Sequence, residues 1–323
     1  MFYSIRHCTR FRYSAAVSES LMEARMHPRT EGTQRCLTFQ LSVSPKARVT
    51  SYRDYLGNMI HHFEVPGNHT ELMIVAESVV DSLQQGERVQ LGPEAWEELD
   101  RLVAEGDYWE MLEPSHFAQP SELLQDLSNS LCVARRSDPL SLLLELNGAI
   151  YNWFAYTPSI TRVDSPIDDA LLTRQGVCQD FAHIMLALTR ELRIPCRYVS
   201  GYLYHGSTNR DRSSEGATHA WVEALLPRLG WVGFDPTNNL LTSERHIRTA
   251  IGRDYADVPP TRGVFKGQAH SELAVSVRVA PSDSMPEMED EFRLSGSWST
   301  FLEQGAEDLE RAQQQQQQQQ QQQ

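Results

Sequence analysis

The stretch Gly176-Val177-Cys178-Gln179-Asp180-Phe181-Ala182-His183 decides how the second half of the chain folds. It opens a segment in which apolar side chains recur every three or four residues: Phe181, Met185, Leu188 and Leu192. This spacing, which ends before Pro195, predicts an amphipathic helix over residues 178–192. Cys178 is therefore expected in the first turn of a helix.

A cysteine in this position has two interpretations. Cysteine attacks as a thiolate, and the unperturbed thiol pKa of roughly 8.5 requires an environment that favours the anion. A helix start supplies one: Gly176 is expected to let the chain turn tightly, and the backbone N–H groups and helix dipole near Cys178 would stabilise a thiolate and an oxyanion. The alternative is an inert, small, buried residue, which describes most free cysteines.

Two polar residues downstream favour the reactive interpretation. His219 opens a predicted strand at residues 219–224, and Asp235 closes another at residues 230–235. If residues 225–229 form a five-residue turn, Ala224 lies opposite Gly230 and His219 lies directly opposite Asp235. Directly opposed residues share a face, so the carboxylate could orient the imidazole and leave its other nitrogen for the thiol. The three residues together predict a nucleophile, its base and the residue that orients the base.

Simpler interpretations of the same residues remain open. His219 could be a satisfied core histidine, and Asp235 a turn carboxylate before Pro236. His183 lies five residues beyond Cys178, about 140° around the helix, and is expected to be structural. Asp180 is expected to stabilise the helix dipole rather than to act in catalysis.

The remaining patterns divide the chain into four parts. Alternating apolar residues predict a β-rich N-terminal domain over residues 1–85, and helical spacing predicts a connector over 86–138. A second core follows over 139–280, with a helix at 141–156, the helix at 178–192, strands at 197–204, 219–224 and 230–235, and a last strand at 272–279 that closes a sheet. Residues 281–323 are acidic and end in polyglutamine, so a disordered tail is expected.

Composition narrows the class of protein. The net charge is -14, of which about -7 comes from the tail, so no nucleic-acid footprint is indicated. The start of the chain has no uninterrupted apolar run, and eighteen apolar residues never follow one another. Five cysteines with no close pair suit reduced thiols. We therefore expect a cytoplasmic protein without membrane contact.

Metal binding is not expected either. The chain has 11 histidines, but it has no Cys-x-x-Cys pair and no His-Glu-x-x-His helix. His61 and His62 are adjacent, so they would lie on opposite faces of a strand. No metal and no cofactor are predicted.

Three segments resemble the bacterial transglutaminase-like superfamily, whose core is papain-like. They are the stretch around Cys178 quoted above, Thr218-His219-Ala220-Trp221-Val222-Glu223, and Trp231-Val232-Gly233-Phe234-Asp235-Pro236-Thr237. The N-terminal β module resembles the domain that precedes such cores, and residues 252–260 resemble the segment that follows them. The resemblance covers roughly residues 1–280 and implies an α+β protein, in which a sandwich-like all-β domain precedes a core with a helix packed on an antiparallel sheet.

The resemblance implies acyl transfer on a peptide or protein substrate. Cys178 would form a thioester, His219 would act as base and then acid, and Asp235 would hold the imidazole. Whether water or an amine resolves the thioester stays open, so a protease, an amidase and a transglutaminase are all compatible. The alternatives are an inactive binding or scaffold module and, less favoured, transfer from a thioester cofactor as in arylamine acetyltransferases. Nothing in the sequence indicates an oligomeric state.

Two further features have competing interpretations. Four aromatic residues could line a cleft or donate to an oxyanion, although such periodic positions usually belong to a core and we expect core for all but one: Trp153, Tyr156, Tyr202 and Trp221. The polyglutamine run could be a solvated end or a substrate that docks in a cleft. The solvated end is favoured because nothing upstream positions the run.

Overall fold

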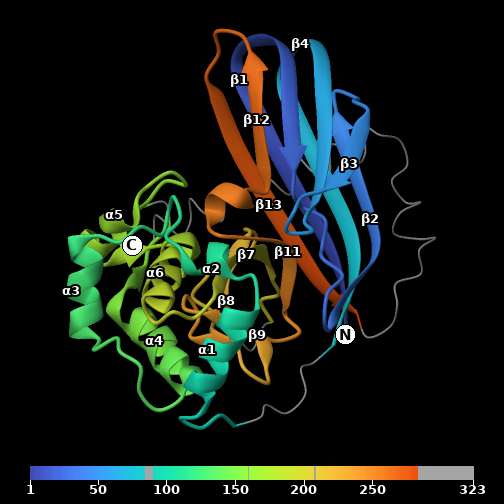
Figure 1. The fold of residues 1–323 in the computed structure, drawn as a ribbon. Coiled ribbons are helices and arrows are strands. Elements are labelled where there is room, and N and C mark those ends of the chain that lie inside the picture. Colours follow the sequence, from blue (N-terminus) through green and yellow to red (C-terminus); the bar gives the residue numbers. More distant parts are fainter. Residues whose placement is uncertain (84–89, 159, 207–208, 283–323) are drawn as a thin grey trace.

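The structure is a computed structural model that describes residues 1–83, 90–158, 160–206 and 209–282. Long strands form an N-terminal module on one side, and the core stands beside it with helices on its far side (Figure 1). Between the module and the helices lies the sheet of the core (Figure 1). The α+β class predicted from the sequence is confirmed.

The N-terminal module is a single six-stranded antiparallel sheet. Two long strands run through its middle, and four shorter ones flank them: β1 (Phe2–Ala24), β4 (Met59–Ser82), β2 (Gln34–Ser44), β3 (Val49–Arg53), β12 (Thr261–Lys266) and β13 (Ser271–Ser282). The register of β1 against β4 shifts between Arg12 and Val17. Apolar residues from both sides of this shift, among them Phe63, Val65, Leu72 and Ile74, form one buried cluster. The sheet thus packs on itself as the sandwich-like domain that was predicted.

The end of the chain corrects one predicted boundary. We predicted that the core extends over residues 139–280 and includes a last strand at 272–279 that closes a sheet. Instead β12 and β13 both pair with β1 of the N-terminal module, and β13 does so from Phe2↔Ser282 to Tyr13↔Ser271. Alternation predicts a strand but does not choose its partner, and β1 offers a long edge that would otherwise stay unpaired. The predicted tail, residues 281–323, overlaps β13 at its first two residues, and residues 283–323 lie outside the described residues.

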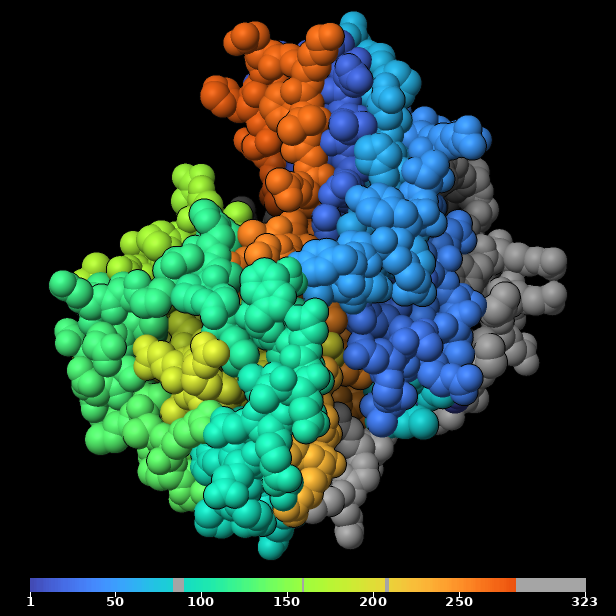
Figure 2. Space-filling view, viewed as in Figure 1, coloured from blue at the N-terminus to red at the C-terminus, as the bar shows by residue number. Residues whose placement is uncertain are grey.

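The connector is helical, as predicted, and packs against the core. It contains α1 (Ala95–Glu105), α2 (Trp109–Leu112) and α3 (Glu122–Ser130). Leu99, Leu124 and Leu127 of these helices are buried in the main hydrophobic cluster of the core. The connector, drawn in teal, crosses the front of the core and reaches the N-terminal module (Figure 2). Among the described helices, none combines the length and the apolar character that crossing a membrane requires.

The core places helices on one face of a five-stranded antiparallel sheet, in the order β10-β9-β8-β7-β11. Its helices are α4 (Pro139–Trp153), α5 (Ile167–Thr173) and α6 (Cys178–Glu191), followed near the end by the short helix η1 (Tyr255–Asp257). The sheet strands are β7 (Cys196–Leu203), β8 (His219–Leu226), β9 (Gly230–Asp235), β10 (Leu240–Leu241) and β11 (His246–Gly252), and β5 (Ala155–Tyr156) pairs separately with β6 (Gln175–Gly176). Because α6 lies between β7, β8 and the other helices, twelve of its residues are buried. A helix packed on an antiparallel sheet was the predicted core.

Side-chain amides from the N-terminal module bind the outer edge of β11. The Asn58 side chain accepts from the Ile251 N–H and donates to the Ile251 carbonyl, both at 2.8 Å. Gln34 does the same at Arg248, accepting at 2.8 Å and donating at 2.9 Å. The two side-chain amides bind backbone groups that a neighbouring strand would otherwise bind. The module therefore covers the edge of β11 that does not pair with β7.

Candidate active site

Cys178 is the first residue of α6, as predicted, and two features shape this helix start. The Asp180 carboxylate accepts hydrogen bonds from the Val177 N–H at 2.8 Å and from the Thr161 hydroxyl at 2.6 Å. A Cβ on Gly176 would lie 2.8 Å from the same carboxylate. Glycine is thus needed here for close packing and not, as we predicted, for a tight turn, because its φ is not positive.

The start of α6 keeps backbone donors for a ligand. Its N-cap residue, Val177, has no side-chain acceptor and forms no side-chain cap. The first N–H groups of the helix, beginning with that of Cys178, therefore point outward with the positive end of the dipole. Burial raises the pKa of Asp180, although the bonds from Thr161 and Val177 act in the opposite direction. Asp180 stabilises the start of α6, as expected.

The strand register differs from the prediction by two residues. Leu226, not Ala224, lies opposite Gly230, because β8 continues through Leu226 and the turn contains only residues 227–229. A shift of two residues preserves the face on which each side chain lies, since strand side chains alternate with a period of two. His219 and Asp235 thus share a face but meet diagonally instead of directly.

His219 and Asp235 form a buried pair beside Cys178. The Nε2 of His219 lies 2.8 Å from Oδ2 of Asp235. Nδ1 is the nitrogen of His219 left to face Cys178, whose side chain is near enough to act on the His219 pKa. Burial alone would lower the pKa of His219, but the charge of Asp235, the hydrogen bond to Asp235 and the nearby Cys178 side chain raise it to about 10. Burial acts to raise the pKa of Asp235, yet His219 and His246 hold it well below its usual range.

Asp235 accepts hydrogen bonds on both oxygens. Oδ1 accepts from the backbone N–H groups of Thr237 and Asn238 at 3.0 and 3.2 Å, which is the turn role considered as an alternative. Oδ2 accepts from His219, from the Asn238 amide at 2.8 Å and from His246, whose Nε2 lies at 3.3 Å. Asp235 thus accepts from the turn backbone through Oδ1 and binds the His219 imidazole through Oδ2.

Sequence reasoning missed Asn238 and His246. Asn238 follows Asp235 by three residues and had a local signal, since Asp-Pro-Thr-Asn is typical of a turn in which the aspartate accepts from the backbone. His246 had none. It comes from β11, which is not a neighbour of β9 in the sheet.

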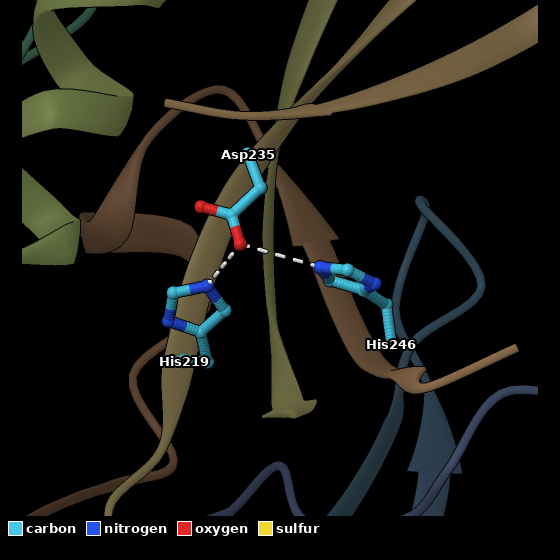
Figure 3. A group of neighbouring side chains, drawn as sticks. All are labelled: His219, Asp235 and His246. Atoms are coloured by element: carbon cyan, nitrogen blue, oxygen red, sulfur yellow. Dashed lines mark hydrogen bonds and ion pairs between the residues drawn. The ribbon is translucent and has the colours of Figure 1, made fainter. Parts of the chain in front are cut away.

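A metal site was not predicted, but His219, Asp235 and His246 have ligand atoms within 4.8 Å of one another. Both rings turn their Nε2 atoms toward Oδ2 of Asp235 (Figure 3). The Nδ1 of His246 accepts from the Ser243 N–H at 3.2 Å. A neutral imidazole that accepts on Nδ1 carries its proton on Nε2, where a metal would need a lone pair. The donor set therefore fits a hydrogen-bonded cluster better than a metal.

Of the four aromatic residues considered for the cleft, Tyr156 is the one that faces the site. Its hydroxyl lies 3.2 Å from the Ser214 hydroxyl, and burial and then the Cys178 charge raise its pKa. Trp221 is fully buried beside His219, and Tyr202 is buried against His7. Trp153 is half-buried under Arg174. Tyr198 and Tyr255, which had not been singled out, also have their pKa values raised, first by burial and then by the Cys178 charge.

His183 is structural, as expected. Its Nε2 accepts from the Tyr255 N–H at 3.2 Å, and its ring stacks on Phe117 at 5.3 Å. Burial lowers its pKa to about 3, so the ring stays neutral. The site therefore contains Cys178, His219 and Asp235 together, and excludes His183.

Comparison with known proteins gives the same grouping. Residues 3–81 match the bacterial transglutaminase-like N-terminal region, and residues 129–236 match the transglutaminase-like superfamily. An uncharacterized protein of Mycobacterium leprae is 31% identical over 277 residues, which span 84% of this chain and 96% of the relative. A protein-glutamine gamma-glutamyltransferase of Pseudomonas aeruginosa is 35% identical over 125 residues, which span 35% of this chain and 19% of that enzyme.

A solved structure has the same fold. It is that of a protein from Cytophaga hutchinsonii named as a candidate cysteine protease, with a TM-score of 0.69 and 24% identity over 90% of this chain and 94% of that one. The fold, the two matched regions and the full-length relative agree. The chain belongs to the transglutaminase-like superfamily and carries the bacterial transglutaminase-like N-terminal region.

Proposed function

We propose that the protein is a cysteine-dependent acyl-transfer enzyme that works through a thioester on Cys178. The observation that carries the proposal is the 2.8 Å contact between His219 Nε2 and Asp235 Oδ2, which leaves the other imidazole nitrogen for Cys178 at the start of α6. A nucleophile, a base and a residue that orients the base are the minimum for this chemistry.

In the first half-reaction Cys178 attacks the carbonyl carbon of a carboxamide or peptide. The thiol proton passes to Nδ1 of His219, and the sulfur–carbon bond forms as the carbonyl oxygen becomes an oxyanion. The N–H groups at the start of α6 lie where they could stabilise that oxyanion. The carbon–nitrogen bond then breaks, and His219 returns the proton to the leaving amine. Throughout, Asp235 compensates the charge of the imidazolium.

In the second half-reaction water or an amine attacks the thioester. His219 removes a proton from the acceptor, the carbon–sulfur bond breaks, and the proton returns to the Cys178 sulfur. Water yields an acid, and an amine yields a new amide. The names of two similar proteins correspond to these two outcomes. The Pseudomonas aeruginosa enzyme is named for transfer, and the Cytophaga hutchinsonii protein is named as a candidate protease.

The proposal is tested with casein as a general protein substrate and a fluorescent primary amine as acceptor. Amine incorporation identifies a transferase, new N-termini a protease, and ammonia release without incorporation an amidase. Cys178→Ala should abolish whichever product the wild type forms, since the residual rate of such enzymes without their nucleophile is lower by roughly 10⁶. The matched control is Cys132→Ala, which removes an exposed free thiol.

Undiminished turnover in Cys178→Ala would contradict the proposal. If the wild type forms no product with casein or a thioester donor, and Cys178 is no more reactive than Cys132, the chain is a non-catalytic module. Acylation by the thioester donor alone would instead indicate the cofactor-dependent reaction.

We also propose a cytoplasmic location and a peptide or protein substrate. The support for the location is chemical: all five cysteines are free thiols, which suits a reducing compartment. Fractionation of cells that express the tagged protein tests this, and recovery outside the cytoplasm would contradict it.

A further inference from the structure

His246 hydrogen bonds the proposed catalytic cluster through Asp235, and its ring also lies 6.3 Å from the His219 ring, centroid to centroid. It opens β11 and is buried, and its Nε2 lies 3.3 Å from the same Oδ2 that binds His219. Asp235 lies between the two imidazole rings (Figure 3). In the part of the chain that the structure describes, the hydrogen bond that joins His246 to this cluster is the one to Asp235. The carboxylate is therefore the group through which a donor on His246 acts on the cluster.

The direction of the hydrogen bond from His246 is fixed by the backbone. The Ser243 N–H donates to Nδ1 at 3.2 Å, so the proton of the neutral ring is on Nε2 and points at Asp235. Burial lowers the pKa of His246, which keeps the ring neutral. The charged and titratable groups that act on its pKa are Asp235, His219 and Arg245, and Glu223 and Arg248 border the same cavity as His246. His246 is thus a fixed, uncharged donor to the carboxylate.

A glycine lets side chains from non-adjacent strands meet here. On β7, Gly201 lies between His219 of β8 and Arg248 of β11. A Cβ on Gly201 would lie 2.1 Å from the Ile247 carbonyl oxygen and 2.7 Å from the Trp221 ring. Since Gly201 has no side chain, the Trp221 ring lies over it and contacts the His246 ring edge-on, with centroids 5.4 Å apart. This packing holds the His246 ring in place.

The space that borders His246 is small. The other side of the ring borders a polar cavity of about 10 Å³, lined also by Trp221, Glu223 and Arg248. A space of this size admits about one water molecule. The environment of His246 is therefore built to hold the ring and not to bind a substrate.

From these contacts we infer that His246 is a positioning residue, which orients the Asp235 carboxylate so that Oδ2 faces His219. The inference rests on the proposed function, because it assigns a role within the same cluster. Without the donor on Nε2, Oδ2 would keep the Asn238 amide as its one partner besides His219 itself, while Oδ1 keeps its two backbone donors. The His219 imidazole would then be less well held, and Cys178 less reactive.

Two amide variants test the inference. In His246→Gln the amide nitrogen falls near the position of Nε2 and can still donate to Asp235, whereas in His246→Asn it falls near Nδ1 and cannot. The readout is iodoacetamide alkylation of Cys178 at pH 6.5, measured by peptide mass spectrometry against the exposed Cys132 of the same molecule. We expect the Cys178 rate to fall about tenfold in His246→Asn, the effect of about one unit in pKa, and to stay within about twofold in His246→Gln. His270→Gln, at an exposed position, is the control.

The outcomes separate this inference from the proposed function. If wild-type Cys178 reacts no faster than Cys132, both proposals fail. If wild-type Cys178 is fast and both variants match it, only the role of His246 is overturned. Equal slowing in both variants also overturns it, because the ring would then act only by filling space.

A measurement on the wild type keeps the inference testable should His246→Asn not fold. Nitrogen-15 NMR of the histidine side chains distinguishes the two neutral tautomers. We expect His246 to carry its proton on Nε2, with no change between pH 6 and pH 8. A proton on Nδ1 would contradict the inference whatever the variants do.

Discussion

At the scale of single residues, the site depends on one carboxylate. Asp235 is fully buried, and its charge is stabilised by His219, His246, Asn238 and two backbone N–H groups. A buried carboxylate without such partners would be protonated and could not stabilise an imidazolium. The raised pKa of His219 is thus a consequence of how Asp235 is held.

The direction of the shift in the His219 pKa determines how the stability of the fold depends on pH. Burial favours neutral His219, and the Asp235 charge outweighs it, so the folded pKa of about 10 lies above the unfolded value. The stability that protonation of His219 contributes is therefore fully present below the unfolded pKa of about 6.5 and is lost as the pH rises through the folded value. Protonation of a leaving amine by His219 would be lost over the same upper range.

We predict that Asp235→Asn lowers the pKa of His219 by at least about two units, because the charge is removed while the burial remains. Side-chain NMR titration of His219 measures this. The alkaline limb of turnover should move to lower pH by the same amount. Asp211→Asn, which removes a carboxylate that pairs with Arg245, is the control. An unchanged His219 pKa in Asp235→Asn would show that the carboxylate is not the cause.

Most residues of the candidate site could be predicted from the sequence. Cys178, His219 and Asp235 were found because each stands in a segment with family character and because parity places the last two on one face. His246 could not be found this way, since its contact with Asp235 depends on Gly201 and Trp221, and strand patterns do not encode such packing between non-adjacent strands.

At the scale of elements, the start of α6 and the β8–β9 hairpin position the site. Helix and strand periodicity predicted both, but the hairpin turn is shorter than predicted. The Leu229 N–H donates to the Leu226 carbonyl at 3.3 Å, so three residues complete the turn. Residues 225 and 226 are apolar and suit either a strand or a turn, so the pattern alone does not fix the register. The prediction that His219 and Asp235 lie together still holds, because a shift of two residues leaves both side chains on the same face of the sheet.

We predict that Gly176→Ala destabilises the protein by about 1–3 kcal/mol, because the added methyl would overlap the Asp180 carboxylate and approach Phe181. Turnover should also fall by about tenfold or more, since Asp180 holds the turn before Cys178. Urea unfolding and the casein assay measure the two effects.

Gly148→Ala in α4 is the matched control. Its Cβ would meet Asn239 at an ordinary contact of 3.5 Å. Alanine in a helix interior should therefore leave stability unchanged or raise it by up to about 1 kcal/mol. Equal stability and turnover in Gly176→Ala and the wild type would contradict the close-packing role of Gly176.

At the scale of the whole molecule, the N-terminal module and the core are interlocked. The chain begins in the module, builds the core, and returns to the module as β12 and β13. Asn58 and Gln34 bind the free edge of β11, the strand that opens with His246. The module therefore supports the strand on which one partner of Asp235 stands. Sequence patterns could not predict this closure, because the pairing of β13 with β1 joins residues that are more than 250 positions apart.

We predict that Asn58→Ala lowers the free energy of unfolding by about 3 kcal/mol, since it leaves the Ile251 N–H and carbonyl without their amide partner. Tryptophan fluorescence during urea unfolding measures this from the connector and the core, because five of the six tryptophans lie in residues 96–231 and none lies in residues 1–83 or 261–282. Far-UV circular dichroism should give the same midpoint. Asn68→Ala, at an exposed position of β4, is the control. Fluorescence that does not respond to Asn58→Ala would show that the two parts unfold independently.

The proposed thioester can be observed itself. The purified protein is incubated with a cell extract, quenched in acid and digested, and the peptide that contains Cys178 is examined by mass spectrometry before and after neutral hydroxylamine. We predict an acyl group on Cys178 that hydroxylamine releases, that persists in Cys132→Ala and that is absent from His219→Ala. An acyl group on another residue, or none on Cys178 in a protein that turns over substrate, would contradict the assignment of Cys178 as the nucleophile.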